Sequence, residues 1–280
     1  MDNSKLPVTV CIPVRNGGRN LGECLESLRG AFAEVVVVDS QSTDGTRETA
    51  LRTGIEVLEF RWDGKFPKKR NWFLRMRGVK TPWVLFLDAD ERVTPDFVAE
   101  LRHRLPEAKE AGFWLTFDNW FESGFLRHGD VFRKLALFRP ETGEYERFPE
   151  EMWSGLDMEV HEHPVLRGKV GEIQARLQHF PFRDAESYRA KHEEYAQWEV
   201  RRRQWLDRSG WEAWAALTTR QWFKYRYLEK WWLGPLYFLV SYLGKAGFLD
   251  GKAGWNFARL KLDYFRRIRS KLLETRKTSR

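Results

Sequence analysis

The first hundred residues alternate between short apolar runs and segments with helical periodicity. Between the first two runs, Leu21, Leu25 and Leu28 recur at the spacing of one helix face. Runs that are apolar throughout are typical of strands covered on both sides. The pattern therefore predicts an α/β fold with a Rossmann-like, mostly parallel sheet and helices on both faces. The predicted strands are Val8–Val14, Ala33–Ser40, Ile55–Phe60 and Trp83–Asp90.

Turn and cap residues mark the ends of the predicted helices. The helix after the second strand should be capped near Ser42–Asp44 and should stop at Gly54. Thr94 is the expected N-cap of a later helix, with Pro95 at its first position. The segment KKRNWFLRMRGV, residues 68–79, is predicted to form another helix between the third and fourth strands.

After about residue 112 the apolar positions alternate with turns, which predicts an antiparallel or mixed layer added to the sheet. From Asp184 onward the chain is predicted to be helical. We expect a catalytic domain over residues 1–183, with a nucleotide-binding half of about 1–111 and an acceptor half of about 112–183. Residues 184–280 would form a helical C-terminal region.

Cysteine usage and the N-terminal sequence restrict the cellular setting. Only Cys11 and Cys24 occur, so no disulfide framework is expected and a reducing compartment is indicated. The N-terminus has no charged segment followed by an apolar stretch of signal-peptide length. A cytoplasmic location follows as an expectation.

The fourth apolar run leads directly into three carboxylates, Asp88, Asp90 and Glu91. Like charges at this density repel one another, so a cation is expected nearby. On an extended chain Asp88 and Asp90 would point to the same side, and such a pair suits Mg²⁺ or Mn²⁺. The alternative is a strand that simply ends in a polar turn.

Other polar residues also follow the strands, where open α/β sheets bind ligands. Asp39 could accept hydrogen bonds from a base or ribose, whereas Asp44 beside Gly45 is equally a turn residue. The basic run at residues 68–70 opens a helix, where its charge opposes the helix dipole. Either an anion lies nearby or these side chains are solvated.

In this order and spacing, IPVRN (12–16), VVDSQSTDGT (37–46), KKRN (68–71) and FLDADE (86–91) resemble the family 2 glycosyltransferases of the GT-A fold. The resemblance covers roughly the first 100 residues. It implies a metal-dependent hexosyltransferase that inverts the anomeric centre, with a UDP-sugar as the expected donor and Mn²⁺ or Mg²⁺ as cofactor. The implied nucleotide-sugar residues are Pro13, Arg15, Asn16, Asp39, Asp44, Lys69, Arg70 and Asp88. The implied metal ligands are Asp88, Asp90 and His179, although His179 could equally be structural.

An inverting transferase needs a base for the acceptor hydroxyl. KLALFRP, EVHE and LQHFPFRD resemble the lipopolysaccharide core β-glucosyltransferase subgroup, in which the VHE segment lies beside the active site. We expect Glu162 as the base, with Asp157 and Glu159 as further candidates. A surface strand of alternating charge is the alternative.

The C-terminal region combines aromatic and basic residues. Its longest apolar run, Trp231–Leu243, is thirteen residues, shorter than the roughly 20 that span a bilayer. Ten basic and two acidic residues follow position 250 and account for the whole net charge of +8. With the basic stretch Arg259–Lys271, this predicts a membrane-surface segment, interfacial or re-entrant. A helical hairpin packed on the catalytic domain, or a dimer interface, is the alternative.

The aromatic segment of the C-terminal region is too apolar for a nucleic-acid-binding surface. The stretch GFLDGKAGW (247–255) resembles a C-terminal signature of the same subgroup. The leading hypothesis is an inverting glycosyltransferase, peripheral on the inner face of the plasma membrane, with a lipid-linked glycan or lipid A core as acceptor. A non-catalytic membrane-associated adaptor with a GT-A fold is the second hypothesis. A nucleotidyltransferase, which would release diphosphate from a triphosphate donor, is the third.

Overall fold

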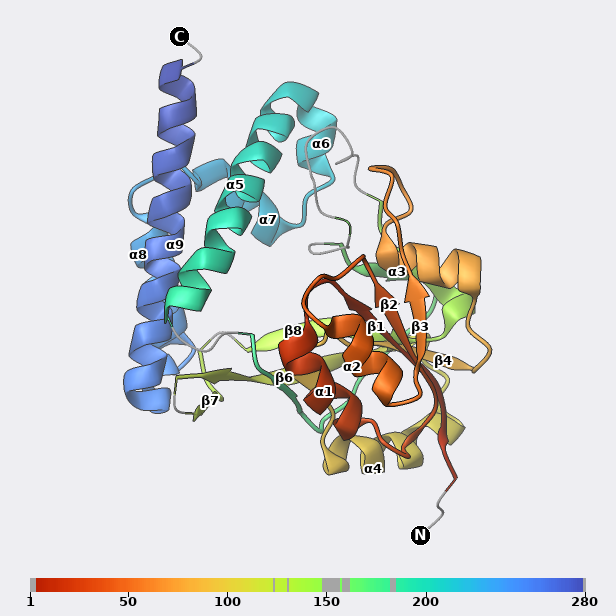
Figure 1. The fold of residues 1–280 in the computed structure, drawn as a ribbon. Coiled ribbons are helices and arrows are strands. Elements are labelled where there is room, and N and C mark those ends of the chain that lie inside the picture. Colours follow the sequence, from red (N-terminus) through yellow and green to blue (C-terminus); the bar gives the residue numbers. More distant parts are fainter. Residues whose placement is uncertain are drawn as a thin grey trace. The chain divides into compact units, whose positions relative to one another are not determined.

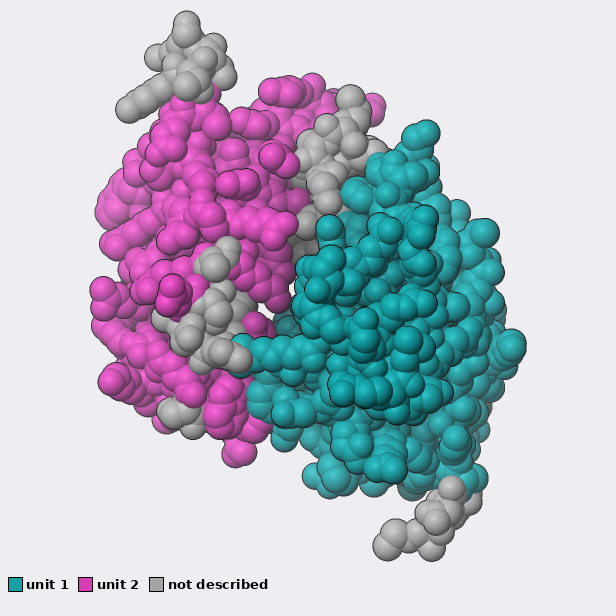
Figure 2. Space-filling model, in the orientation of Figure 1, with its two compact units in different colours: residues 1–118, 132–180 teal, residues 119–131, 181–280 magenta. Residues whose placement is uncertain are grey.

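The structure is a computed structural model that describes residues 4–122, 124–129, 131–147, 157, 162–181 and 185–278. The chain divides into two compact units, drawn in different colours in Figure 2. The first comprises residues 1–118 and 132–180, and the second comprises residues 119–131 and 181–280. Each unit has its own hydrophobic core.

Four parallel strands form the centre of the first unit (Figure 1). β1 pairs with both β2 and β4, and β2 pairs with β3, so the order is β3-β2-β1-β4. Val14 at the end of β1 lies opposite Asp39 at the end of β2. The carboxyl ends of these strands therefore meet at one edge of the sheet. The strands are β1 (Leu6–Val14), β2 (Phe32–Asp39), β3 (Glu56–Glu59) and β4 (Trp83–Phe86).

An antiparallel extension begins at β4, which confirms the predicted change of layer. β8 pairs antiparallel with both β4 and β6, and β12 and β5 complete the sheet. β11 lies parallel to β6, while β9 and β10 form a separate two-stranded sheet. The extension consists of β5 (Glu91–Arg92), β6 (Gly112–Phe121), β8 (Phe132–Phe138), β11 (Val170–Glu172) and β12 (Leu177–His179). The separate sheet consists of β9 (Gly143–Tyr145) and β10 (Pro164–Leu166).

Helices cover both faces of the sheet because alternate residues of the parallel strands are apolar on both sides. On one face, Val10 and Ile12 share a core with Leu21, Leu25 and residues of α2 and α4. On the other face, Cys11 and Val38 pack with Phe73. The predicted α/β fold class is confirmed. The helices are α1 (Gly18–Ser27), α2 (Thr46–Arg52), α3 (Lys69–Trp72), continued by the π-helical turn η1 (Phe73–Arg77), and α4 (Pro95–Arg104), which leads into the 3₁₀ turn η2 (Leu105–Glu107).

The predicted cap of α4 is confirmed, since Thr94 Oγ1 accepts a hydrogen bond from Phe97 N at 3.2 Å. α2 begins slightly later than expected. Its N-cap is Gly45, whose φ of 81° lies in the left-handed region that favours glycine. The stop at Gly54 is confirmed by its φ of 72°.

The second unit is mainly helical, as predicted. Its core joins apolar residues of α5 and α9 to Leu228 and Leu233. Two charged side chains of α5, Glu199 and Arg203, are buried and hydrogen-bonded to Tyr225, through its hydroxyl at 2.7 Å and its carbonyl respectively. The strand β7 (Gly124–Leu126) pairs with the end of β6. The helices and turns are α5 (Ala185–Ser209), α6 (Trp211–Ala215), α7 (Thr219–Tyr227), α8 (Leu233–Leu239), η4 (Val240–Gly244), η5 (Gly247–Asp250) and α9 (Gly251–Thr278). Over the described part of the chain, no helix is both long and apolar enough to cross a bilayer.

His192 of α5 should make the second unit sensitive to acid. Its ring stacks on Tyr188 at 3.6 Å between centroids, and burial lowers its pKa to about 4. In the unfolded chain the imidazole takes a proton near pH 6.5. The folded state takes it only at lower pH, so stability is lost as the pH falls from about 6.5 toward 4.

Between about pH 7 and pH 5, we therefore expect the wild type to lose about 1–2 kcal/mol of unfolding free energy that His192→Gln does not lose. Urea unfolding followed by circular dichroism measures this difference. His103→Gln, at an exposed position on α4, is the matched control. Equal pH dependence of wild type and His192→Gln would contradict the assignment.

Candidate functional site

The candidate site lies at the edge where β1, β2 and β4 end. Asp39 at the end of β2 is 2% exposed, and its carboxylate accepts hydrogen bonds from the amide and hydroxyl of Ser42. Arg15 and Asn16, just after β1, are exposed at the same edge. Pro13 is buried within β1 opposite Val38. The structure therefore brings together the polar residues that sequence reasoning placed after the first two strands.

Asn16 ties these two loops to each other. Its backbone N–H donates to Ser42 Oγ at 2.8 Å, and its Oδ1 accepts from Thr43 N at 2.9 Å. Its φ of 53° is in the left-handed region, which asparagine tolerates better than most residues. A ligand at this edge would meet a loop pair whose shape is already fixed.

Asp44 holds the start of α1 in place. Its Oδ2 accepts from Gly18 N at 3.0 Å, and its Oδ1 accepts from the amide and hydroxyl of Thr46. Desolvation acts in the opposite direction, but the hydrogen bonds from Thr46 and Gly18 lower the pKa of Asp44. These hydrogen bonds show that Asp44 acts as a turn residue, one of the two roles considered for it.

The basic run that opens α3 is buried rather than solvated, so the alternative of exposed lysines is wrong. Lys69 Nζ donates to Val14 O at 3.0 Å and lies 3.3 Å from Asp157 Oδ2. Burial lowers the pKa of Lys69, against the opposing effect of Asp157. Lys68 Nζ donates to Glu162 Oε1 at 3.0 Å, and both side chains are buried.

Two of the three expected base candidates are thus attached to α3. Asp157 pairs with Lys69 and Glu162 with Lys68, so residues far along the chain meet the nucleotide-side edge. The side chain of Asp157 is 15% exposed, compared with 3% for Glu162. Glu159 lies outside the described residues.

Asp88 is the centre of a charged cluster. Arg70 Nη2 donates to Asp88 Oδ1 at 2.7 Å, and Lys134 Nζ donates to Asp88 Oδ2 at 3.0 Å. Lys134 also donates to Glu91 Oε2 at 2.7 Å. Burial opposes ionisation of Asp88, but Lys134 and Arg70 hold its pKa well below the usual range. The cations that this run of carboxylates requires are therefore present in the protein itself.

Glu91 has the opposite character. Its side chain is fully buried, its Oε2 also accepts from Asp88 N at 2.8 Å, and burial raises its pKa to about 7. Its Oε1 is buried with no hydrogen-bond partner among the described residues. Asp88 and Glu91 thus share one lysine but differ in how readily they take a proton.

The extended geometry expected for Asp88 and Asp90 is wrong. β4 ends at Phe86, and Glu91 N donates to Asp88 O at 2.9 Å, which closes a turn between the two carboxylates. The backbone of Asp90 is held instead by the residue that follows β12, because Phe180 N donates to Asp90 O at 2.8 Å. The polar turn considered as an alternative is the observed structure.

Asp90 faces His179, the third residue of the expected metal set. Asp90 Oδ1 lies 3.6 Å from His179 Nε2, and the imidazole stacks on Phe132 with ring centroids 4.9 Å apart. Two ligands about 2.1 Å from one ion are about 3 Å apart at the octahedral angle, so a relative shift of about half an ångström would let both atoms bind one ion. No group of three or more His, Cys, Asp or Glu suited to a metal occurs among the described residues. Asp90 and His179 fit a divalent ion whose other ligands come from elsewhere, while Asp88 is engaged by cations.

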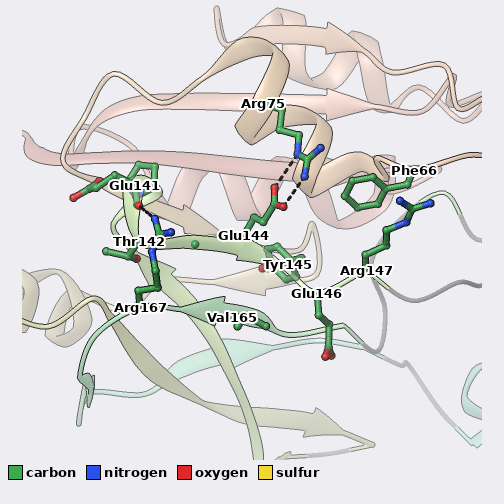
Figure 3. Close-up of a pocket in the computed structure, with 12 residues that line it drawn as sticks. Phe66, Arg75, Glu141, Thr142, Glu144, Tyr145, Glu146, Arg147, Val165 and Arg167 are labelled. Carbon is green, nitrogen blue, oxygen red and sulfur yellow. Dashed lines mark hydrogen bonds and ion pairs between the residues drawn. The ribbon is translucent and has the colours of Figure 1, made fainter. Parts of the chain in front are cut away.

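A cavity of about 660 Å³ lies elsewhere in the first unit, beside β9 and β10 (Figure 3). Arg75 donates two hydrogen bonds to Glu144, at 2.8 and 2.5 Å, and Arg167 donates to Glu141 O at 3.1 Å. None of the residues expected at the site lines this cavity. Among its charged lining side chains, Arg75 and Glu144 form an ion pair.

Sequence reasoning missed Lys134. On β8 it alternates with Phe132 and Ala136, both of which contact the main core. A lysine at a core-facing position of a strand is unusual unless it is paired. That break in the apolar alternation was the available signal, but only the folded sheet shows which carboxylates Lys134 meets.

The sequence pattern of the family described as Glycosyl transferase family 2 matches residues 9–167. The lipopolysaccharide core biosynthesis glycosyltransferase LpsC of Rhizobium meliloti is 30% identical over 185 residues, 63% of this chain and 64% of that protein. A TPR repeat-containing protein of Synechococcus elongatus is 31% identical over 106 residues, 38% of this chain and 26% of that protein. The chain thus spans less than two thirds of the length of either relative.

Among solved structures, glucosyl-3-phosphoglycerate synthase from Mycobacterium tuberculosis in complex with Mn²⁺, UDP and glucosyl-3-phosphoglycerate is similar, with 23% identity and a TM-score of 0.31. The similarity covers 42% of this chain and 44% of that one.

Removing Lys134 should destabilise the first unit. In Lys134→Met, Asp88 and Glu91 would lose their shared cation in a buried place, a change that usually costs about 3–5 kcal/mol. Because Glu91 can take up a proton in compensation, we expect a loss of about 2–4 kcal/mol near pH 8. Urea unfolding measures it, with Lys109→Met at an exposed position as the control. Equal stability of the two variants would show that the cluster does not balance these charges.

Proposed function

Because the chain belongs to glycosyl transferase family 2, we propose that it moves a sugar from a nucleotide-sugar donor to a lipid-linked or lipopolysaccharide-type acceptor. The family pattern covers residues 9–167 and so includes every strand end that forms the candidate edge. The observation that carries the proposal is the charged cluster at that edge, where Arg70 and Lys134 converge on Asp88. A diphosphate placed beside such a cluster would find cations already held by buried partners.

The donor would occupy the edge formed by the ends of β1, β2 and β4. In this proposal Asp39 accepts hydrogen bonds from the nucleoside, and the Arg15–Asn16 loop closes over it. Lys69 and Arg70 would lie toward the phosphates. UDP is the nucleotide we propose, by likeness to the family.

Asp90 and His179 are the residues we propose to hold Mn²⁺ or Mg²⁺, with phosphate oxygens completing the coordination. When bound, the ion would neutralise the negative charge that grows on the departing diphosphate. Asp88 would act beside it through Arg70 and Lys134, which place fixed positive charge at the same edge. This division of roles differs from a site in which both aspartates ligate the metal.

The proposed reaction inverts the anomeric centre in one displacement. The acceptor oxygen forms a bond to the anomeric carbon while the bond from that carbon to the diphosphate breaks, and its electron pair stays on the diphosphate. The proton of the acceptor hydroxyl passes to a carboxylate, for which Glu162 remains our choice. Lys68, 3.0 Å from Glu162, would hold that carboxylate in its ionised and oriented form.

The acceptor proposal draws on the relative named for lipopolysaccharide core biosynthesis, which shares 30% identity over 185 residues. An acceptor of that kind carries an acyl or polyprenyl anchor, whereas the donor is water-soluble. We therefore propose a peripheral location at the inner face of the plasma membrane.

Nucleotide binding tests the donor site. Thermal unfolding of the whole chain with each nucleoside diphosphate at about 1 mM, with and without Mn²⁺, should show a metal-dependent stabilisation of about 2–5 °C for one nucleotide, UDP by this proposal. Asp90→Ala and His179→Ala should abolish the metal-dependent part, while Asp63→Ala at an exposed position should keep it. No stabilisation by any nucleotide would favour the adaptor hypothesis, and stabilisation by triphosphates alone would favour nucleotidyltransfer.

The base assignment is tested by amide variants of the three carboxylates. Removing a general base typically lowers turnover by about 10²–10⁴-fold. We expect that loss in kcat for Glu162→Gln, with little change in the KM of the donor. Asp157→Asn and Glu159→Gln should lower kcat less, as measured by release of the nucleoside diphosphate. If Asp157→Asn or Glu159→Gln shows the larger loss, the base is that residue and not Glu162.

A further inference from the structure

α8 and the turn η4 that continues it have two different apolar faces. One face packs against α9 within the second unit: Leu233 is buried, and the ring of Tyr237 stacks on Phe265 with centroids 4.2 Å apart. At Gly234 a β-carbon would lie 3.1 Å from Leu262, so the helices approach closely there. Through this face α8 and α9 form a helical hairpin within the second unit (Figure 1).

The other face is apolar and exposed. Leu236, Leu239, Val240 and Leu243 recur at helical spacing, and each is between 36% and 57% exposed. Isolated exposed leucines are common on protein surfaces, but four on one helical face form a contiguous surface. The described helices of the second unit do not cover it.

The turn that follows extends this surface. Phe248 and Leu249 are 47% and 59% exposed, and Trp255, at the start of α9, is 45% exposed. The Trp255 ring lies 5.2 Å from that of Tyr242, and the Phe248 ring lies 6.3 Å from it, so these side chains adjoin η4. We call Leu236, Leu239, Val240, Leu243, Phe248, Leu249 and Trp255 the apolar patch.

Glycines fix the shape of this turn. A β-carbon on Gly247 would lie 2.7 Å from Ser241 O, and one on Gly254 would lie 2.0 Å from Gly247 O. Neither position accepts a larger residue without a shift of the backbone. The GFLDGKAGW stretch therefore forms a tight turn that presents Phe248 and Leu249 to solvent.

Basic residues surround the apolar patch. Lys245, Lys252 and Arg259 are exposed, and the only acid between residues 236 and 259 is Asp250. The Asp250 carboxylate is occupied, since it accepts hydrogen bonds from Arg127 N and His128 N at 3.0 Å each. The margin of the patch is thus positively charged.

Much of the basic stretch predicted to meet lipid is used inside the unit. Arg267 and Lys271 pair with Glu193 of α5, at 2.7 and 2.5 Å, and Arg269 Nε donates to Glu229 O at 2.9 Å. These side chains hold α9 to its neighbours. The exposed basic side chains Lys245, Lys252 and Arg259 lie nearer the apolar patch in the sequence than most of the Arg259–Lys271 stretch does.

We infer that the apolar patch inserts into the headgroup and upper acyl layer of an anionic lipid bilayer, with Lys245, Lys252 and Arg259 contacting the lipid phosphates. An amphipathic surface of this kind is buried by about 5–10 Å in such a layer. A second copy of the chain is a less suitable occupant, because two patches in contact would bring like charges together. This inference rests on the membrane location in the proposed function and names the surface that would contact the bilayer. Membrane binding and sugar transfer are separate properties, so either can be disproved without the other.

Vesicle sedimentation without donor or acceptor tests the inference. The full chain should sediment with phosphatidylcholine vesicles that contain about one third phosphatidylglycerol, and much less with phosphatidylcholine alone. Phe248→Ser with Leu249→Ser should weaken binding by at least about tenfold, since both side chains lose their apolar contact with lipid. Leu51→Ser with Met76→Ser, which removes two apolar side chains 53% and 70% exposed in the first unit, should bind as the wild type does.

Fluorescence gives a second readout that does not depend on those variants. Brominated lipids should quench the wild type, and Trp255→Phe should lose part of that quenching. Absence of wild-type binding, or equal binding by the Phe248/Leu249 double variant, would overturn the inference. So would a wild-type dimer in sedimentation velocity that the double variant converts to monomer while vesicle binding stays unchanged.

Discussion

The arrangement at the sheet edge depends on one constraint. The carboxylates that lie where the buried strand β4 ends must be neutralised by cations. Lys134 reaches both Asp88 and Glu91, and Arg70 takes the remaining oxygen of Asp88. Without these cations, the carboxylates buried where β4, β8 and α3 meet would have no partners of opposite charge, which is costly in a place removed from water. In the proposed function, the same cations would also lie beside the diphosphate of the donor. One group of residues would then serve both stability and donor binding.

The central fold was predictable because β1, β2 and β4 are mainly apolar runs and the segment between β1 and β2 has apolar residues at helical spacing. The carboxyl ends of the parallel strands were predictable for the same reason. The location of Asn16, Asp39 and Asp88 at one edge of the sheet follows from them. What the sequence could not reveal is pairing across long separations in the chain. The lysines of α3 looked like candidates for a solvated surface, yet Lys68 and Lys69 are buried against Glu162 and Asp157, about ninety residues later. Similarly, the turn that separates Asp88 from Asp90 follows from their separate partners and not from local sequence.

The second unit shows how one helix can serve two environments. Apolar residues of α8 alternate between a face packed on α9 and a face that meets solvent, so the composition of the segment alone fits both a hairpin and a membrane-surface element. In the structure α8 packs on α9 within the second unit, and the exposed apolar face remains in addition to that contact. Basic side chains are divided in the same way, since some are held by Glu193 and Glu229 and others are exposed. Composition and net charge describe the sum of these roles and cannot separate them.

The close glycine contacts at Gly247 and Gly254 have a kinetic consequence. A flexible loop that presents two apolar residues loses backbone entropy when it docks, and a slow search for the docked shape precedes tight binding. In this chain the turn is already fixed by contacts that exist before any encounter. Docking through Phe248 and Leu249 would therefore proceed as a single rigid-body step, whose rate is set by electrostatic attraction and diffusion, while the lifetime of the docked state is set by the apolar area removed from water.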